Sequence, residues 1–169
     1  MKKTKMLLLL CLVICIVGCK QDVDTVKTSD VPEEKYSCEI PNLEANVFAT
    51  KWGNIYTTCK ASDFFGTHGF TWGDIVTVRF LDQELVLPVV PNYYYVDEGK
   101  AAIIIEKGDD RTPRGYLSMA IHMGNFISTY GIGTKVTNED NTWYWVQNEG
   151  VSFPIEVKFE MYEQGGYPL

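Results

Sequence analysis

The stretch Ile75–Val90, "IVTVRFLDQELVLPVV", gives the clearest information about the fold. Apolar β-branched and aromatic residues alternate with polar ones on both sides of Asp82-Gln83, which is the pattern of two strands joined by a tight hairpin. Similar short runs, separated by turn residues, recur through the chain. The strands expected from these runs are Ala45–Phe48, Asn54–Cys59, Ile75–Leu81, Glu84–Val90, Ala101–Glu106, Leu117–Ile121, Thr142–Val146 and Ile155–Tyr162.

Helical periodicity is almost absent from the same region. One short helical turn is expected at Gly124–Tyr130, because Asn125 can cap its start and Gly131 can end it. The sequence therefore predicts an all-β fold. We expect a small barrel or sandwich of about seven to nine mostly antiparallel strands, with at most one or two short helical turns.

The beginning of the chain has the features of an export signal. Three lysines precede Met6–Val17, an apolar run shorter than the roughly twenty residues that span a bilayer. The run leads into Ile16-Val17-Gly18-Cys19, which resembles a bacterial lipobox. The sequence therefore predicts a lipoprotein signal peptide over residues 1–18 and acyl chains on Cys19. An ordinary signal peptide or an uncleaved anchor is the alternative.

The segment after the lipobox, "KQDVDTVKTSDVPEEKY", is polar and acidic. This composition predicts that residues 19–36 form the acylated cysteine and a flexible tether, and that residues 37–169 form a single folded domain. The expected location is the bacterial cell envelope, where the lipid on Cys19 would hold the exported protein on a membrane.

The charge balance excludes some classes of partner. The net charge of the chain is −7, and loss of the three leader lysines would lower it to −10. Such an acidic surface argues against nucleic acid as a partner, and against electrostatic docking on anionic lipid. Attachment to the membrane is therefore expected to depend on the lipid.

The cysteines and histidines suggest no metal site. Cys38 and Cys59 would remain in the exported domain, where they could form a disulfide or stay as two buried thiols, and the sequence leaves both open. The histidines are His68 and His122, and neither is adjacent to another residue of a metal-ligating type. We expect no metal and no cofactor.

Catalytic motifs are also missing from the sequence. There is no Gly-x-Ser-x-Gly, no His-Glu-x-x-His and no phosphate-binding glycine-rich loop. His122 is the one candidate base, and a structural role at the end of a strand explains it more simply. Loop acids such as Asp74 and Asp97 are expected to form turns or carry solvated charge. We therefore expect no enzymatic activity from this chain by itself.

Three stretches together resemble a known family. They are "WGNIYT" (Trp52–Thr57), "WGDIVTVRFLDQELVLPVVPNYYYVDEG" (Trp72–Gly99) and "GYLSMAIHMGNFISTYGIG" (Gly115–Gly133). Their order resembles the C-terminal β-barrel domain of the S-adenosylmethionine hydroxide adenosyltransferases, a family that also contains the fluorinases and chlorinases. The resemblance covers residues 47–136, so residues 37–136 would form the family-like barrel. Residues 137–169 would be an extra C-terminal hairpin or tail.

The resemblance implies a binding site for adenosine or S-adenosylmethionine. Asn54 matches the family's asparagine whose amide hydrogen-bonds adenine, and Trp52 matches the aromatic residue before that turn's glycine. Tyr93 matches the aromatic residue that stacks on the base. The backbone of a second turn would lie near the base edge, and it comprises Met123, Gly124 and Asn125. The alternative is that the aromatic rings pack on each other at the barrel mouth while the asparagines simply form turns.

Departures from the family pattern limit what the resemblance implies. Thr50 and Tyr95 stand where the family commonly has aspartates, and the family's N-terminal domain, which carries the chemistry, has no counterpart here. The expected function is thus that of a non-catalytic binding module for an adenosyl-type or other aromatic small ligand. The alternatives are a structural or protein-interaction lipoprotein without a small ligand, and a partner that completes a composite enzyme site. A monomer and a homotrimer are both compatible with the resemblance.

Overall fold

The structure is a computed structural model that describes residues 35–105 and 115–165. The predicted signal peptide, Cys19 and nearly all of the predicted tether lie outside the described residues. Within them, no helix has the length and apolar character needed to cross a membrane.

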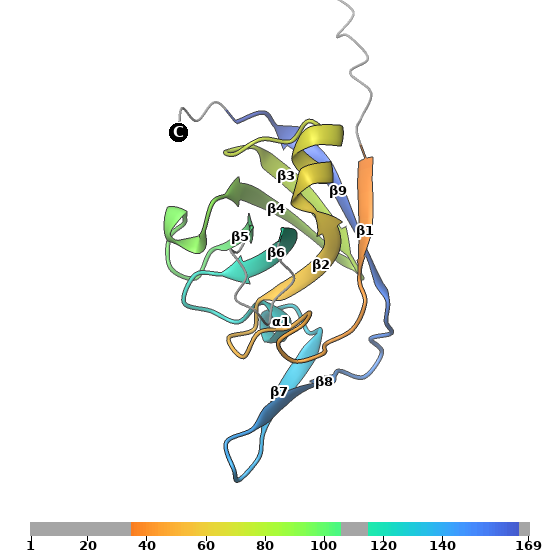
Figure 1. Cartoon of the computed structure of the whole chain (residues 1–169), viewed down its shortest axis with the longest axis vertical. Helices are drawn as coiled ribbons and strands as arrows, with labels where there is room; N and C mark the ends of the chain where they lie inside the picture. The colour runs from red at the N-terminus through yellow and green to blue at the C-terminus, as the bar shows by residue number, and fades with distance from the viewer. Residues whose placement is uncertain (1–34, 106–114, 166–169) are drawn as a thin grey trace, which may run out of the picture. The chain divides into compact units, whose positions relative to one another are not determined.

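The described residues form a nearly closed barrel (Figure 1). Seven strands share one sheet in the order β1-β9-β3-β4-β5-β6-β2, and β7 and β8 form a separate two-stranded sheet. The strands are β1 (Lys35–Ile40), β2 (Ile55–Lys60), β3 (Ile75–Phe80), β4 (Gln83–Val90), β5 (Ala101–Ile104), β6 (Tyr116–Ile121), β7 (Gly133–Thr137), β8 (Trp143–Gln147) and β9 (Ile155–Glu163). The helical segments are short: η1 (Asp63–Thr67), η2 (Tyr93–Tyr95) and α1 (Phe126–Thr129). The predicted all-β fold class is confirmed.

The hairpin expected from Ile75–Val90 is β3–β4. Its strands pair antiparallel from Ile75 opposite Pro88 to Phe80 opposite Gln83. The turn residues are Leu81 and Asp82, one position earlier than the predicted Asp82-Gln83, and Leu81 adopts a positive φ of 49°. All the other pairs of the large sheet are antiparallel except β4 and β5, which run parallel.

The segment expected to be an extra tail contributes to the main sheet. β9 lies between β1 and β3 and pairs with both along its length. The sequence boundary at residue 137 therefore does not separate a barrel from an appendage. The β7–β8 hairpin projects from the barrel, at the end opposite to the one where β1 begins (Figure 1).

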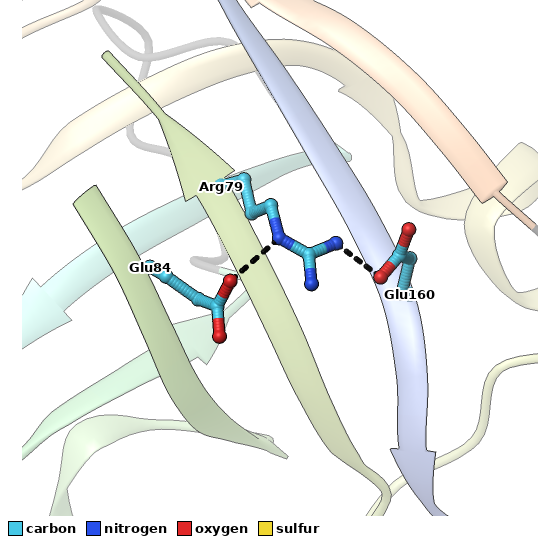
Figure 2. A network of polar contacts seen from close by, with 3 residues as sticks. All are labelled: Arg79, Glu84 and Glu160. Carbon is cyan, nitrogen blue, oxygen red and sulfur yellow. Dashed lines mark hydrogen bonds and ion pairs between the residues drawn. The ribbon is translucent and has the colours of Figure 1, made fainter. Parts of the chain in front are cut away.

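Arg79 links three strands on the outer surface of the barrel (Figure 2). From β3, its Nε donates to Glu84 of β4 over 2.8 Å, and its Nη1 contacts the carboxylate of Glu160 on β9. Opposite charges on neighbouring strands stabilise their pairing modestly when exposed to solvent. The contact ties the central hairpin to the strand that follows the β7–β8 hairpin.

The barrel closes without a hydrogen-bonded ladder between its end strands. β1 and β2 stand at opposite ends of the strand order, and a disulfide between Cys38 and Cys59 joins them with a Cα–Cα distance of 5.6 Å. The backbone N–H of Glu39 also donates to Oγ1 of Thr58 over 3.0 Å. We call this boundary between β1 and β2 the seam. Of the two possibilities that the sequence left open for the cysteines, the structure has the bridge.

Side chains fill the barrel interior, so it is a packed core. Phe64 and Phe70 stack with their ring centroids 4.1 Å apart, and Phe64 meets Phe159 of β9 edge to face. A second, smaller apolar cluster contains Val90, Ala102, Ile104 and Ala120, against which Tyr93 and Val96 pack. Ala102 and Ile104 flank Ile103, which belongs to the interior cluster, so this second cluster lies on the outer face of the sheet.

Several predicted elements are wrong in detail. Ala45–Phe48 is a turn instead of a strand, because the carbonyl of Glu44 accepts N–H bonds from Val47, Phe48 and Ala49. β1 starts at Lys35, inside the predicted tether, and the sequence did not suggest β7. The predicted strand Ala101–Glu106 is described only as far as β5 and Ile105, since Glu106 lies outside the described residues.

Candidate functional site

The two glycine-asparagine turns singled out in the sequence contact each other. The carbonyl of Gly53 accepts the backbone N–H of Ile127 over 3.1 Å. Gly53 has a φ of +89°, and a Cβ atom added to it would lie only 2.1 Å from Oδ1 of Asn125. Glycine is therefore required here both for the backbone conformation and for the close approach of the second turn. We call Lys51–Asn54 and Met123–Asn125 together the two-turn site.

Thr50 organises the first turn from within. Its Oγ1 accepts the backbone N–H groups of Trp52 over 3.3 Å and of Asn54 over 3.1 Å, while its own N–H donates to the carbonyl of Asn54 over 3.0 Å. A neutral hydroxyl therefore accepts the backbone N–H bonds within this turn.

Asn125 organises the second turn. Its Oδ1 accepts the backbone N–H of Ser128 over 2.9 Å and thereby caps α1, as the sequence predicted. Met123 has a positive φ of 56°, and the N–H of Gly124 donates to the carbonyl of Ile121 over 3.0 Å. The cap uses the carbonyl oxygen of the Asn125 amide. The amide nitrogen retains its two donor hydrogens for other partners.

The residues of the two-turn site differ in what they present to solvent. Trp52 is 67% exposed and Met123 is 80% exposed, while Gly124 and Asn125 are half-buried. Asn54 is only 7% exposed. Asn54 therefore has little surface to offer a ligand, and its predicted contact with adenine stays a prediction.

Tyr93 lies close to the second turn. Its ring centroid is 5.7 Å from that of His122, the residue directly before Met123. Nδ1 of His122 lies 2.8 Å from the carbonyl oxygen of Val96, which fastens the segment after η2 to the end of β6. Tyr93 belongs to η2, which is a 3-10 turn and not part of a strand.

The β7–β8 hairpin supports the first turn, which the sequence alone did not suggest. Nε1 of Trp145 donates to the carbonyl of Thr50 over 3.0 Å, and Nζ of Lys135 donates to the carbonyl of Lys51 over 2.8 Å. Nζ of Lys51 lies 4.4 Å from the centroid of the Trp52 ring. The aromatic run "TWYWVQ" indicated a hairpin strand, but no local sequence pattern shows which turn such a hairpin will contact.

A groove of about 910 Å³ runs beside β4 and is lined by a different set of residues. Its aromatic rings are those of Trp72, Tyr95 and Tyr130, and burial raises the pKa of Tyr130 above the ordinary value, which favours the neutral phenol. None of the six predicted ligand-binding residues lines this groove. The sequence reasoning missed it, because a groove between strands and loops far apart in the chain leaves no local signal.

The acids of the described part of the chain include one buried carboxylate, that of Asp74. No group of three His, Cys, Asp or Glu side chains gathers there as metal ligands would. Asp74 is buried, and its carboxylate accepts from the N–H of Thr71 over 2.6 Å and from the N–H of Gly165 over 2.7 Å. A buried carboxylate with such partners is satisfied as a turn-forming group.

Comparison with known proteins identifies the fold alone. No family model matches the chain, and no curated protein matches it. Among solved structures, the chain is similar to an uncharacterized conserved protein from Thermotoga maritima, with a TM-score of 0.50 and 18% sequence identity. The match covers 75% of this chain and 36% of that protein, so this chain corresponds to only about a third of its length.

Proposed function

We propose that the protein is an exported, lipid-anchored binding module without catalytic activity, and that an adenosyl-type or other aromatic small ligand binds at the two-turn site. One observation carries the proposal. Of the three segments that the resemblance named, Trp52–Asn54 and Tyr93 each adjoin the chain around Met123–Asn125, although all three are far apart in sequence. The Gly53–Ile127 hydrogen bond and the Tyr93–His122 contact join them.

Each of these groups would have a distinct role in binding. The rings of Trp52 and Tyr93 would stack on a flat heterocycle, which contributes roughly 1–3 kcal/mol per ring in comparable sites. The amide nitrogen of Asn125 would donate to a ring nitrogen or a carbonyl of the ligand. Asn54 would act from beneath, through the backbone contacts with Thr50 that hold the turn in shape.

Thermal unfolding of the full chain with adenosine and with S-adenosylmethionine tests the proposal. A ligand present at a hundred times its dissociation constant should raise the unfolding free energy by about 2.7 kcal/mol. Trp52→Ala should reduce that increase, whereas Tyr162→Ala, which removes another exposed aromatic ring from β9, should leave it unchanged. Absence of any shift with both compounds would remove the small-ligand function.

The alternative is a structural or protein-interaction lipoprotein. The groove beside β4 favours it, because the groove is large, has apolar walls and contains none of the residues that the resemblance assigned to a ligand. Adenosine distinguishes the two functions. It would bind at the two-turn site of a small-ligand-binding module, and it would not bind to a structural or protein-interaction lipoprotein.

The membrane anchor is tested separately from the ligand. Metabolic labelling with a radioactive fatty acid should mark the wild-type protein in a bacterial host and should fail to mark Cys19→Ser. The wild-type chain should also fractionate with membranes after high-salt washing, since attachment would depend on acyl chains and not on charge. Equal labelling of both proteins would contradict the proposed acylation of Cys19.

A further inference from the structure

Most of β4 lacks a neighbouring strand on one side. Along one edge β4 pairs with β3 from Gln83 to Pro88, but along the other it pairs with β5 only at Val89 and Val90. Within residues 35–105 and 115–165, no strand pairs with Gln83–Pro88 on that second edge. Natural sheets normally protect such edges, because an unpaired edge is a template for another strand.

The direction of the backbone groups follows from the β3–β4 pairing. The N–H of Val89 donates to the carbonyl of Asp74 over 2.8 Å, on the side of β3. Backbone groups of successive residues in a strand point to opposite edges, so Leu85 and Leu87 also face β3. The N–H and C=O groups of Glu84 and Val86 therefore face the open edge.

The open edge borders the apolar groove. Leu85, Leu87, Ala101 and Tyr130 line its walls. Val86 is 50% exposed at the middle of the edge. An added strand would therefore find backbone partners at Glu84 and Val86, and apolar surface for alternate side chains.

Charge favours a basic occupant. Asp82 lies exposed directly before β4, and Asp97 and Glu98 lie exposed after η2. Glu84 is exposed as well, but its carboxylate already pairs with Arg79. Lys100 is the only cation among the described residues that line the groove, and Asp97 lines it too. On a chain of net charge −7, this edge would attract an extended segment that carries lysine or arginine.

We infer that the edge of β4 from Gln83 to Leu87 binds an extended, basic segment of a partner polypeptide by strand addition. The added strand ends at Pro88, which has no N–H to donate. Apolar side chains at alternate positions enter the groove, and basic side chains on the other face meet the flanking carboxylates. This surface is separate from the two-turn site, so the inference does not depend on the proposed small ligand.

Amide exchange and chemical-shift changes in the isotope-labelled full chain test the inference directly. The probe is a capped synthetic peptide of alternating lysine and valine. The amides of Glu84 and Val86 should exchange quickly in the free protein, and the peptide should slow their exchange and shift their signals. Peptide N-methylated at the amides that face β4 should bind at least about tenfold more weakly, because it loses the ladder bonds but keeps the charge and side chains.

Variants of Val86 provide the matched control. Val86→Pro removes the N–H on the open edge and should abolish peptide binding, whereas Val86→Thr keeps it and should bind like the wild type. Continued protection of the Leu85 and Leu87 amides shows that the β3–β4 ladder is intact in Val86→Pro. Equal binding of the methylated peptide overturns the inference. Slow exchange of the Glu84 and Val86 amides in the free chain also overturns it, because the edge would then already be occupied. Dimerisation of the chain through this edge overturns it as well, because the partner would then be a second copy.

Discussion

Gly53 shows how one residue can decide whether two distant turns touch. Its positive φ and the absence of a side chain let the carboxamide of Asn125 occupy the place where a Cβ would lie. Thr50 and Asn125 act beside it by accepting N–H groups that the turns would otherwise leave without a partner. At this scale, the candidate site depends on small groups that each satisfy one backbone requirement.

Replacement of Gly53 by alanine should therefore cost more than backbone strain alone. We expect Gly53→Ala to lower the unfolding free energy by about 3 kcal/mol, because the left-handed backbone costs about 1 kcal/mol and the overlap with Asn125 adds a similar or larger amount. Gly150→Ala is the control. Gly150 has a φ of +81° and no atom within 4 Å of its added Cβ, so only the backbone cost of about 1 kcal/mol should apply.

Denaturant unfolding of the two variants measures the difference. Equal losses for Gly53→Ala and Gly150→Ala would mean that Asn125 moves aside without cost, and the close approach of the two turns would then not constrain the site.

The strands illustrate which elements a sequence can predict. β3, β4 and β9 were expected because apolar residues alternate along them and face a packed interior. β1 was not predicted, because its residues, "KYSCEI", continue the polar composition of the preceding segment. "ANVF" looked like a strand, but Asn46 has a positive φ of 63° and the carbonyl of Glu44 organises a turn.

The candidate site could be predicted only in part, because sequence patterns report local structure and the site also depends on distant contacts. The glycine-asparagine turns are local patterns, and the family resemblance suggested that they would converge. The supporting contacts of Lys135 and Trp145 join residues more than eighty positions from their partners, and no local pattern encodes them. The groove beside β4 arises because β5 is short, which is visible only once the sheet is assembled.

The turn of the β7–β8 hairpin should respond to acid. The pKa of Asp140 lies below its ordinary value, because its carboxylate accepts two hydrogen bonds from Thr142. The bond from the Thr142 hydroxyl has the larger effect and the bond from the Thr142 backbone N–H the smaller. A lowered pKa in the folded state contributes stability above the unfolded-state pKa of about 4, and this contribution is lost as the pH falls through the folded-state value. The hairpin turn should loosen in that acidic range.

Thr142→Val should raise the pKa of Asp140 part of the way to its ordinary value, since the backbone donor remains. Thr134→Val is the matched control, because the Thr134 hydroxyl donates to Asn148 instead. Carboxyl signals followed by NMR titration measure both. An unchanged Asp140 titration in Thr142→Val would show that the hydroxyl does not contribute.

The contact of Arg79 with Glu84 and Glu160 should stabilise the sheet between strands. We expect Arg79→Met to lower the unfolding free energy and the loss to shrink at high salt, where exposed charges are screened. Lys158→Met is the comparison, because Lys158 pairs with Glu156 on its own strand over 3.1 Å and links no neighbouring strand. A smaller effect for Arg79→Met than for Lys158→Met in denaturant unfolding would contradict this role.

For the molecule as a whole, the seam is the place where the barrel closes without pairing between strands. The strand order ends at β1 on one side and at β2 on the other, and the Cys38–Cys59 bridge joins the two ends. The bridged residues are 21 positions apart, so the bond restricts a loop of moderate length in the unfolded chain. It should therefore contribute substantially to stability in an oxidising compartment.

Removal of the bridge should lower the unfolding free energy by about 3 kcal/mol, as expected for a loop of this length. The double variant Cys38→Ser with Cys59→Ala, compared with the wild-type chain in denaturant, measures the loss. A reducing agent should destabilise the wild type to a similar level and leave the double variant unaffected. If wild type and double variant unfold at the same denaturant concentration, the hydrogen bond from Glu39 and the core packing are enough to close the seam.

The position of this bond also has a mechanical consequence. A pulling force that enters the domain through its N-terminal end would peel β1 away from β9 one residue at a time. Only Lys35, Tyr36 and Ser37 of β1 precede Cys38, so the peeling would stop there and the load would pass covalently to β2. A protein held by its N-terminus against shear would thus bear tension through a sulfur–sulfur link and leave the rest of its first strand in place.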